Sequence, residues 1–356
     1  MIRLLFLSGR ESGYIRNRVL LNALRQQFEV TLLTPERGGI TARTVGGLAR
    51  FVARRPRYDL CIAGFYGQMI AIGLSLLQRQ PLLLDAFVST YDTLCEDRRR
   101  FGPRSPAGRL ARWLDVHGCR VAARVLTDTA AHAQYFETLG VAREKLFPLY
   151  VGCDETLFYP RPAPPAVAAR FEVFTYGSFL PLHGVEVVVQ AAARLRDRPE
   201  IHFTIGGDGT RRPAVEREIA ALGLDNVDLV GWIPFAQLPD WIASADLCLG
   251  GHFSCIAKAQ RVIATKTFQF VAMQRPTVVG DNPATRELFV PGEHVWAVPM
   301  GDAAALAEAV RRLAGDPPLR RRLAQGGYQR FRERLATPVL AGQLARIVEE
   351  TCASAW

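Results

Sequence analysis

Residues 176–192 are YGSFLPLHGVEVVVQAA, in which a strand runs into a glycine turn and then into a helix. Gly177 and Gly184 let the backbone approach a ligand closely, and the free amides at the start of a helix bind anions. The pattern recurs in TIGGDGTRR (204–212), where Gly207 lies in a second turn between a strand and a helix. Two such turns at one edge of one sheet predict an α/β fold with a ligand site at that edge.

The same alternation of strand and helix extends along the whole chain. We expect strands in two sets, first at 3–7, 29–33, 59–63, 81–84, 124–127 and 146–150, then at 172–175, 201–205, 227–230, 247–249, 277–279 and 294–298. We expect helices between them near 15–27, 66–79, 106–122, 129–139, 184–196, 213–222, 236–243, 265–273, 302–314, 317–334 and 338–352. Alternation of this kind predicts parallel sheets with helices on both faces.

The stretch FYPRPAPPAVAARF (158–171) interrupts the alternation and predicts a linker, because proline resists helix interiors and sheet ladders. We therefore expect two Rossmann-like domains, 1–160 and 161–336, facing each other across a cleft. A C-terminal helix within 337–356 is expected to pack back on the first domain. Ligands of such folds bind outside the carboxyl ends of the strands, so the cleft is the expected site.

Composition is that of a globular protein with room for two domains. The chain has 356 residues, of which 49% are hydrophobic and 22% charged, and no apolar stretch is long enough to span a membrane. The start, MIRLLFLSGRESGY, predicts a first strand and lacks the features of a signal peptide. Seven scattered cysteines without a C-x-x-C pair favour neither a disulfide framework nor a metal site, which indicates a cytoplasmic protein.

Positive charge is concentrated in two places, 49–59 and 97–125, within a chain of net charge +10. This pattern fits an anionic partner, such as the inner face of a membrane to which the protein would bind peripherally, or the surface of a protein from an arginine-rich proteome. The helix at 106–125 can be amphipathic, which suits a bilayer surface or packing on its own core. A nucleic-acid partner is disfavoured, because no recognition motif or aromatic array accompanies the charge.

Common catalytic motifs are missing. The chain has no G-x-G-x-x-G after its first strand, no G-x-x-x-x-G-K-[ST], no G-x-S-x-G and no H-E-x-x-H. Nicotinamide-dependent redox chemistry, P-loop phosphoryl transfer and two classes of hydrolase thereby lose their main support.

What the chain does contain is an ordered set of motifs from 177 to 289. It runs G-S-F-x-x-x-H-G, G-G-D-G, G-W-I-P-x-x-x-L-P-x-W-I-x-x-A-D, R-V-I-x-x-K-x-x-Q, R-P-T-V-V-G-D and R-E-L-F. This order resembles the retaining glycosyltransferases of family 4, which have the GT-B fold, and covers the C-terminal half. The N-terminal half is similar more loosely, through S-G-Y-I-R-N (12–17), L-L-L-D-A-F-V-S-T-Y-D-T (82–93) and L-T-D-T-A-A-H (126–132).

The resemblance implies a nucleotide-sugar donor, UDP- or GDP-linked, on the C-terminal domain and an acceptor hydroxyl on the N-terminal domain. It implies sugar transfer with retention, without a metal or other cofactor. Cleaving the sugar–phosphate bond leaves two negative charges, which helix N-termini and basic side chains can stabilise. His252, in G-G-H-F-S, is a candidate beside the donor sugar, although a lone histidine is more often structural. The donor residues that the resemblance implies lie in the glycine turns and the segments after them: Gly177, Ser178, His183, Gly184, Gly207, Trp232, Ile233 and Glu287. Among these, Trp232 and Ile233 would border the nucleobase.

The segment KAQRVIATKTFQF (258–270) departs from the family pattern. The family usually has an arginine and a lysine where this chain has Ser178 and His183, and a Glu-x7-Glu pair where it has Arg261 and Gln269. Lys266 lies three residues before Gln269 and so shares its helical face. We expect a helix capped by Thr265, with Lys266 and Arg261 holding the diphosphate and Gln269 binding the ribose. This K-x-x-Q is similar to a subgroup with K-x-x-E/Q.

Three residues of the N-terminal half are candidates for contact with the acceptor hydroxyl. Asp85 ends a buried strand, where an exposed carboxylate would face the cleft. Asp92 follows in a loop rich in hydroxyl side chains, and His132 follows the next strand. Helix capping or turn formation explains the two aspartates equally well.

The leading interpretation is a glycosyltransferase whose acceptor is a lipid-linked or cell-envelope glycan precursor. Two alternatives stay open at this stage. One is a non-catalytic subunit that binds a nucleotide sugar, and the other is a sugar-nucleotide epimerase with the GT-B fold. Product analysis separates all three.

Overall fold

A computed structural model describes residues 2–162 and 170–354 of the chain. It divides into two compact units, one formed by Met1–Val151 with Thr337–Trp356 and the other by Gly152–Ala336. The chain therefore passes from the first unit to the second after Val151, nine residues before the expected domain boundary at 160. Residues 163–169 of the proline-rich stretch lie outside the described residues.

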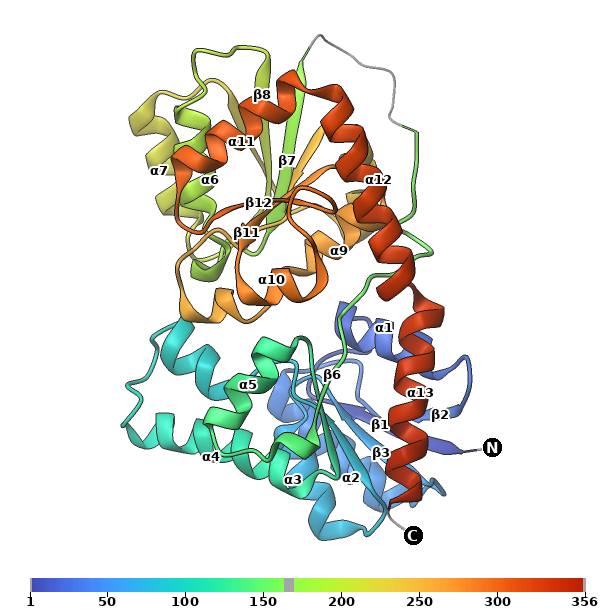
Figure 1. Cartoon of the computed structure of the whole chain (residues 1–356). Helices are drawn as coiled ribbons and strands as arrows, with labels where there is room; N and C mark the ends of the chain where they lie inside the picture. The colour runs from blue at the N-terminus through green and yellow to red at the C-terminus, as the bar shows by residue number, and fades with distance from the viewer. Residues whose placement is uncertain (1, 163–169, 355–356) are drawn as a thin grey trace. The chain divides into compact units, whose positions relative to one another are not determined.

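The first unit contains a parallel sheet of six strands in the order β2-β1-β3-β4-β5-β6 (Figure 1). Its strands are β1 (Arg3–Ser8), β2 (Glu29–Leu32), β3 (Leu60–Gly64), β4 (Leu82–Asp85), β5 (Arg124–Thr127) and β6 (Leu146–Pro148). The central strands β3 and β4 are buried along their whole length, as expected for a sheet that helices cover on both faces.

Helices cover both faces of this sheet. They are α1 (Ile15–Leu24), α2 (Ile40–Arg54), α3 (Gln68–Leu77), α4 (Pro106–Val121), α5 (Ala130–Thr138) and α13 (Thr337–Ala353), with a π-helix over Asp92–Asp97 and a 3-10 turn over Arg143–Lys145. The helices α2 to α5 share one hydrophobic cluster. The C-terminal helix α13 packs with α1 on the other face, where Leu344 and Val348 contact the cluster around Leu20.

The second unit repeats the design with the strand order β12-β11-β10-β7-β8-β9. Its strands are β7 (Phe171–Gly177), β8 (Ile201–Gly207), β9 (Val227–Gly231), β10 (Leu247–Leu249), β11 (Thr277–Asp281) and β12 (Trp296–Pro299). Its helices are α6 (Val185–Ala193), α7 (Arg212–Leu222), α8 (Leu238–Ser244), α9 (Thr265–Ala272), α10 (Pro283–Leu288), α11 (Ala303–Gly315) and α12 (Pro317–Arg334), with 3-10 turns over Pro181–His183, Phe235–Gln237 and Ala257–Gln260. The chain leaves β7 toward β8 and β9, and β10 starts the other half of the sheet. The point between β7 and β10 is therefore the topological switch, where α/β sheets bind ligands.

Two details of the sequence prediction need correction. The helix α2 (Ile40–Arg54) was not predicted, because Gly46 and Gly47 interrupt its middle and no side chain caps its start. The helix α9 begins at Thr265 as expected, but Ala264 is its N-cap, so Thr265 is not a capping residue. Within 2–162 and 170–354, no helix is both long and apolar enough to cross a membrane.

Candidate donor site

Lys266 lies at the topological switch of the second unit. It occupies the first turn of α9, and its Nζ donates hydrogen bonds to Thr175 Oγ1 at 3.1 Å and to the Tyr176 carbonyl at 3.0 Å. Thr175 in turn donates to the carbonyl of Leu249 on β10 at 2.8 Å. These bonds join the ends of β7 and β10 to the helix, and they hold the lysine amine at the carboxyl edge of the sheet.

Burial lowers the pKa of Lys266 from 10.5 to about 7. Within the described ranges this side chain forms no ion pair. A neutral amine has two hydrogens, and the two acceptors Thr175 and Tyr176 use both of them. Protonation adds a third N–H and a positive charge. An anionic ligand can accept a hydrogen bond from this N–H and form an ion pair with the ammonium group.

Two histidines stack beside this lysine. The rings of His183 and His252 are 5.4 Å apart with 18° between their planes, and the Nδ1 atom of each is buried without a hydrogen-bond partner in the described part of the chain. Burial first, then the charge of Lys266, lowers the pKa of His183 to about 3. Burial also lowers the pKa of His252, and the neighbouring His183 and Lys266 add to this effect. Burial thus disfavours the charged form of all three basic groups.

Lysine is rare in this chain, so two lysines on or next to one cluster are a distinctive feature of the site. The sequence has 44 lysines and arginines, and only Lys145, Lys258 and Lys266 are lysines. Two of the three lie on or next to the cluster, and Lys258 is close enough to lower the pKa of His252. Arginine stays protonated when it is buried, whereas lysine can lose its proton. A lysine at position 266 can therefore gain or lose its proton near neutral pH, which an arginine at this position would not.

The glycine turns bring the backbone close to this cluster. A Cβ on Gly177 would lie 2.9 Å from His183 Nδ1 and 3.8 Å from Lys266 Nζ, so the turn borders both basic groups. Gly207 has φ +122°, and a Cβ there would lie 1.9 Å from the Gly177 carbonyl oxygen. Only glycine fits at position 207. The exposed Ser178 and the N-cap Gly184 of α6 complete the turn.

Gln269 lies on α9, three residues after Lys266. Its side chain is 1% exposed, and its Oε1 accepts a hydrogen bond from the Tyr176 hydroxyl. The contact of Gln269 with a ribose stays a prediction, and the structure shows the amide buried and bonded to Tyr176. Gln269 thus fixes Tyr176, whose carbonyl binds Lys266.

The other predicted donor residues surround the same edge of the sheet. Trp232 follows β9 with 70% of its surface exposed, while Ile233 is buried against Gly206. Arg261 follows the 3-10 turn Ala257–Gln260, as expected for a loop residue, and Glu287 lies on α10; both are partly buried. The exposure of Trp232 leaves its ring free to stack on a base.

In the first unit Asp85 is buried and paired. Its carboxylate is 0% exposed and accepts hydrogen bonds from Arg16 Nη2 at 2.8 Å and Arg16 Nε at 3.1 Å. Arg16 also donates to the carbonyls of Leu149 and Tyr150. The expectation that Asp85 presents an exposed carboxylate is therefore wrong. Burial raises the pKa of Asp85, although Arg16 opposes this effect.

The other two acceptor candidates are also buried. Asp92 begins the π-helix Asp92–Asp97, and its backbone N–H donates to Ser89 Oγ at 3.0 Å. His132 Nδ1 lies 2.6 Å from Asp128 Oδ1, and its Nε2 has no hydrogen-bond partner in the described ranges. The pair His132–Asp128 is close enough to Asp85 to influence its pKa. Sequence reasoning missed Asp128, Arg16 and Tyr176, since only the fold shows which of the many polar residues lie together.

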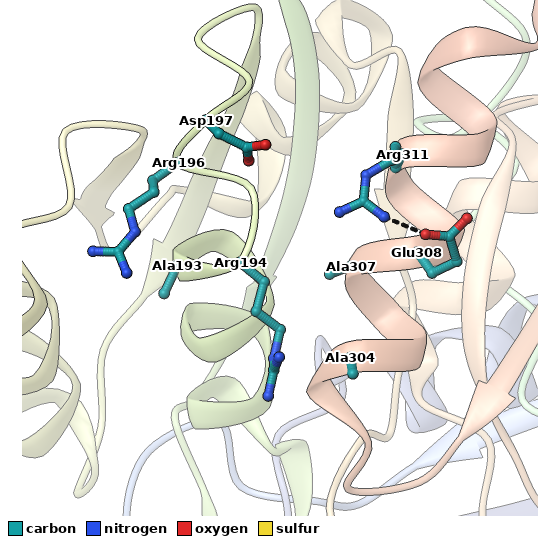
Figure 2. Close-up of a pocket in the computed structure, with 8 residues that line it drawn as sticks. All are labelled: Ala193, Arg194, Arg196, Asp197, Ala304, Ala307, Glu308 and Arg311. Atoms are coloured by element: carbon teal, nitrogen blue, oxygen red, sulfur yellow. Dashed lines mark hydrogen bonds and ion pairs between the residues drawn. The ribbon is translucent and has the colours of Figure 1, made fainter.

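A groove in the second unit lies away from this site. It has a volume of about 570 Å³ and lies between the C-terminal end of α6 and the helix α11, with Arg194, Arg196 and Arg311 at its walls (Figure 2). Arg311 forms an ion pair with Glu308 in the same groove. The C-terminal end of α6 lies at the opposite edge of the sheet from the carboxyl ends of the strands, so this groove is not part of the site around Lys266.

Two parallel six-stranded sheets with a basic site at a topological switch define a fold of the GT-B type. Residues 170–316 match the family model described as glycosyl transferases group 1. The matched residues lie within the second unit, which is therefore similar to glycosyl transferases group 1 over most of its length.

Curated relatives carry the same similarity. The chain is 28% identical over 252 residues to alpha-D-kanosaminyltransferase of Streptomyces kanamyceticus, which covers 68% of this chain and 64% of that protein. It is 27% identical to the lipopolysaccharide core biosynthesis glycosyltransferase LpsD of Rhizobium meliloti, over 49% of this chain and 50% of the relative. The chain thus spans less than two thirds of either relative.

Solved structures match the fold along nearly the whole chain. HepE of Anabaena, crystallised in complex with UDP and glucose, gives a TM-score of 0.75 at 18% identity and covers 98% of this chain and 100% of its own. Sucrose-phosphate synthase of Thermosynechococcus elongatus gives a TM-score of 0.77 at 16% identity and covers 99% of each chain. Both units therefore have the arrangement of strands and helices found in these proteins.

Proposed function

We propose that this protein is a retaining glycosyltransferase that moves a sugar from a nucleotide-sugar donor to a hydroxyl acceptor. The observation that carries the proposal is the basic cluster of Lys266, His183 and His252 at the switch point of the second unit, which is similar to glycosyl transferases group 1. A nucleoside diphosphate is the leaving group of such a donor. Its charge matches a site in which burial lowers the pKa of a lysine to about 7, because a bound anion would favour the protonated amine.

The donor diphosphate is proposed to lie between Lys266 and the N-terminus of α6. The glycine turn Gly177–Gly184 gives the phosphates access to backbone N–H groups, and the helix dipole favours their charge. We propose that these groups neutralise the leaving group without a metal ion, in a subgroup that uses K-x-x-Q in place of Glu-x7-Glu. Arg261 and Glu287 are proposed to complete this site.

The nucleobase is proposed to stack on Trp232, beside Ile233. The HepE structures contain UDP, and their fold matches this chain. On this likeness we propose UDP as the nucleotide, with GDP as the alternative to be tested beside it.

The transfer is proposed to proceed on one face of the sugar. The bond from the anomeric carbon to the phosphate oxygen breaks, and the acceptor oxygen bonds to the same carbon from the same side. The acceptor proton moves to the departing phosphate, so a strong protein base is not required. Lys266 stabilises the charge that develops on the phosphate.

The acceptor is proposed to bind the first unit and to be a glycan or a lipid-linked precursor. Among curated relatives, LpsD is named for the biosynthesis of a lipopolysaccharide core. Asp92 and His132 remain the proposed contacts of the acceptor hydroxyl. A membrane-anchored acceptor would bring the enzyme to the inner face of the membrane as a peripheral protein.

A thermal-shift screen tests the donor class, because a ligand that binds only the folded state raises the melting temperature. UDP-, GDP-, ADP- and TDP-sugars are compared with and without EDTA, for the wild type and for Lys266→Met. We expect a shift with UDP-sugars that survives EDTA and is lost in the variant. Shifts that require Mg²⁺ would refute metal independence, and the absence of any shift would refute donor binding.

One observation favours a second candidate, a donor-binding subunit without catalysis. The family's paired glutamates are replaced by Arg261 and Gln269, and Gln269 is buried. Slow hydrolysis of the bound donor in water, followed by release of free sugar, would exclude this candidate. An epimerase would instead convert the donor into a second nucleotide sugar without any acceptor.

A further inference from the structure

A strongly basic surface of the first unit is left unused by the proposed transfer. It comprises the loop after the π-helix and the first half of α4, with exposed arginines Arg98, Arg99, Arg100, Arg104 and Arg109. In the described part of the chain, the side chains of these five form no ion pair and no hydrogen bond. We call these arginines, together with Leu110 and Trp113, the α4 surface.

Arginines greatly outnumber carboxylates in this part of the sequence. Residues 98–122 contain seven arginines and a single carboxylate, Asp115. Asp115 is 0% exposed, and its oxygens accept hydrogen bonds from Gln68, Ser89 and the backbone of Thr90 and Tyr91. Its charge is therefore used inside the unit. Of the two carboxylates that precede Arg98, Asp97 is buried and Glu96 is half-buried, so the exposed side chains of this surface are mainly arginines.

Apolar side chains share the exposed face of α4 with these arginines. Leu110 is 57% exposed and Trp113 is 48% exposed, and their spacing of three residues places them on one side of the helix together with Arg109. The ring of Trp113 stacks on His117 at 4.6 Å with 16° between the planes, which orders it without burying it. Leu110 and Trp113 thus add exposed apolar surface to a face that also carries arginine.

The helices α2 and α3, which lie in the same layer as α4, also expose large hydrophobic side chains. Among the described residues of the first unit, every large hydrophobic side chain that is exposed lies on α2, α3 or α4: Val45, Val52, Leu76, Leu77, Leu110 and Trp113. The helix α3 packs against both α2 and α4. The outer side of one layer thus combines apolar side chains with unpaired arginines.

We infer that the α4 surface docks the protein on an anionic lipid bilayer. Arginines at a membrane surface bind lipid phosphates and gain from its negative potential, while tryptophan and leucine enter the interface between head groups and acyl chains. A nucleic acid would take up the charge but would leave Leu110 and Trp113 in water. The surface begins six residues after Asp92, so docking would place the first unit's proposed acceptor region near the bilayer.

Flotation of the full-length protein with vesicles tests this inference without using transferase activity. Vesicles of phosphatidylcholine alone are compared with vesicles that also contain phosphatidylglycerol, at low and at high salt. We expect binding only to the anionic vesicles, and weaker binding at high salt because the charges are screened. Equal binding to both vesicle types, or none to either, would overturn the inference.

Two variants and one matched control locate the surface. Arg99→Glu/Arg100→Glu/Arg104→Glu should weaken vesicle binding about hundredfold, since each arginine at an anionic surface contributes about fivefold in affinity. Leu110→Ser/Trp113→Ser should weaken it at least about tenfold with the charge unchanged. Arg194→Glu/Arg196→Glu/Arg217→Glu, on exposed positions of the second unit, should bind as the wild type does.

Circular dichroism and melting temperature show whether each variant is folded. If the control weakens binding as much as the α4 variant does, net charge alone explains the attraction and the inference fails. If duplex DNA displaces the vesicles and binds the Leu110→Ser/Trp113→Ser variant normally, the surface serves a nucleic acid. None of these vesicle-binding measurements involves a nucleotide sugar. A negative result would therefore refute membrane docking and leave the proposed sugar transfer untouched.

Discussion

Replacing Lys266 with methionine should stabilise the fold and weaken donor binding at the same time. The pKa of this lysine falls from 10.5 to about 7 on burial, so near neutral pH keeping it costs the folded state about 4 kcal/mol. Methionine removes that cost but leaves the Tyr176 carbonyl without its donor, which costs about 1–3 kcal/mol. We expect a net gain in unfolding free energy of about 1–3 kcal/mol.

The same substitution removes the proposed cation from the diphosphate. A charge-assisted hydrogen bond is worth about 1.5–3 kcal/mol, so the Kd of the donor should rise about 10- to 100-fold. Lys145 offers a matched control, because its Nζ also donates to two backbone carbonyls, at 2.7 and 2.8 Å, in the first unit. Lys145→Met should leave donor binding unchanged.

The pH dependence follows from the sign of the shift. Between pH 7 and 10.5 the unfolded chain keeps the Lys266 proton and the folded chain has lost it, so stability rises with pH in this window. Donor binding runs in the opposite direction, because the diphosphate must restore the proton. Above pH 7 the Kd should therefore increase about tenfold per pH unit, until donor-bound Lys266 itself loses the proton.

Titration calorimetry with UDP and UDP-sugars from pH 6 to about 9 measures this dependence. Lys266→Arg keeps its charge over the whole range and should give a flat profile. Chemical unfolding of the same proteins measures how their unfolding free energy changes with pH. A flat wild-type profile, or a Lys266→Met variant that is less stable and binds the donor normally, would refute the reasoning.

Three further substitutions separate structural from ligand-binding roles. Asp85→Asn should lower the unfolding free energy by about 3–5 kcal/mol, because it leaves the buried charge of Arg16 unpaired; unchanged stability with lost transfer would return Asp85 to the acceptor site. Gly207→Ala should cost about 2–4 kcal/mol, since its Cβ would collide with the Gly177 carbonyl oxygen; a normal melting temperature would contradict that geometry. Trp232→Ala should change stability by less than about 0.5 kcal/mol and raise the donor Kd about 5- to 100-fold; an unchanged Kd would remove Trp232 from the nucleobase site.

The strands of this fold were predictable because each is an apolar run bounded by turns. All twelve strands lie within two residues of their predicted starts, and the two parallel sheets follow from the alternation. The helix α2 was missed for a local reason. It has two central glycines and no capping side chain, so its stability comes from Phe51 packing against the sheet, which no local pattern shows.

The candidate site was predictable in its place but not in its electrostatics. Recurring glycine turns after parallel strands indicated the carboxyl edge of the second sheet, and Lys266 lies there. That Lys266 is desolvated between β7, β10 and two stacked histidines depends on residues up to 91 positions apart. A pKa is set by burial and neighbours, and the order of residues along a chain specifies neither.

The sequence by itself determined the class of fold and the two-unit organisation, and it predicted the sheet edge at which a ligand is expected to bind. Hydrophobic periodicity and turn residues are local quantities, so a linear pattern carries them. Only the tertiary structure decided which polar residues are available. Asp85 and Gln269 looked suited to a ligand but are used by Arg16 and Tyr176, because burial forces every polar group to find a partner inside the protein. Lys266 is different, because its neutral amine satisfies its neighbours and can still accept a proton for an anion.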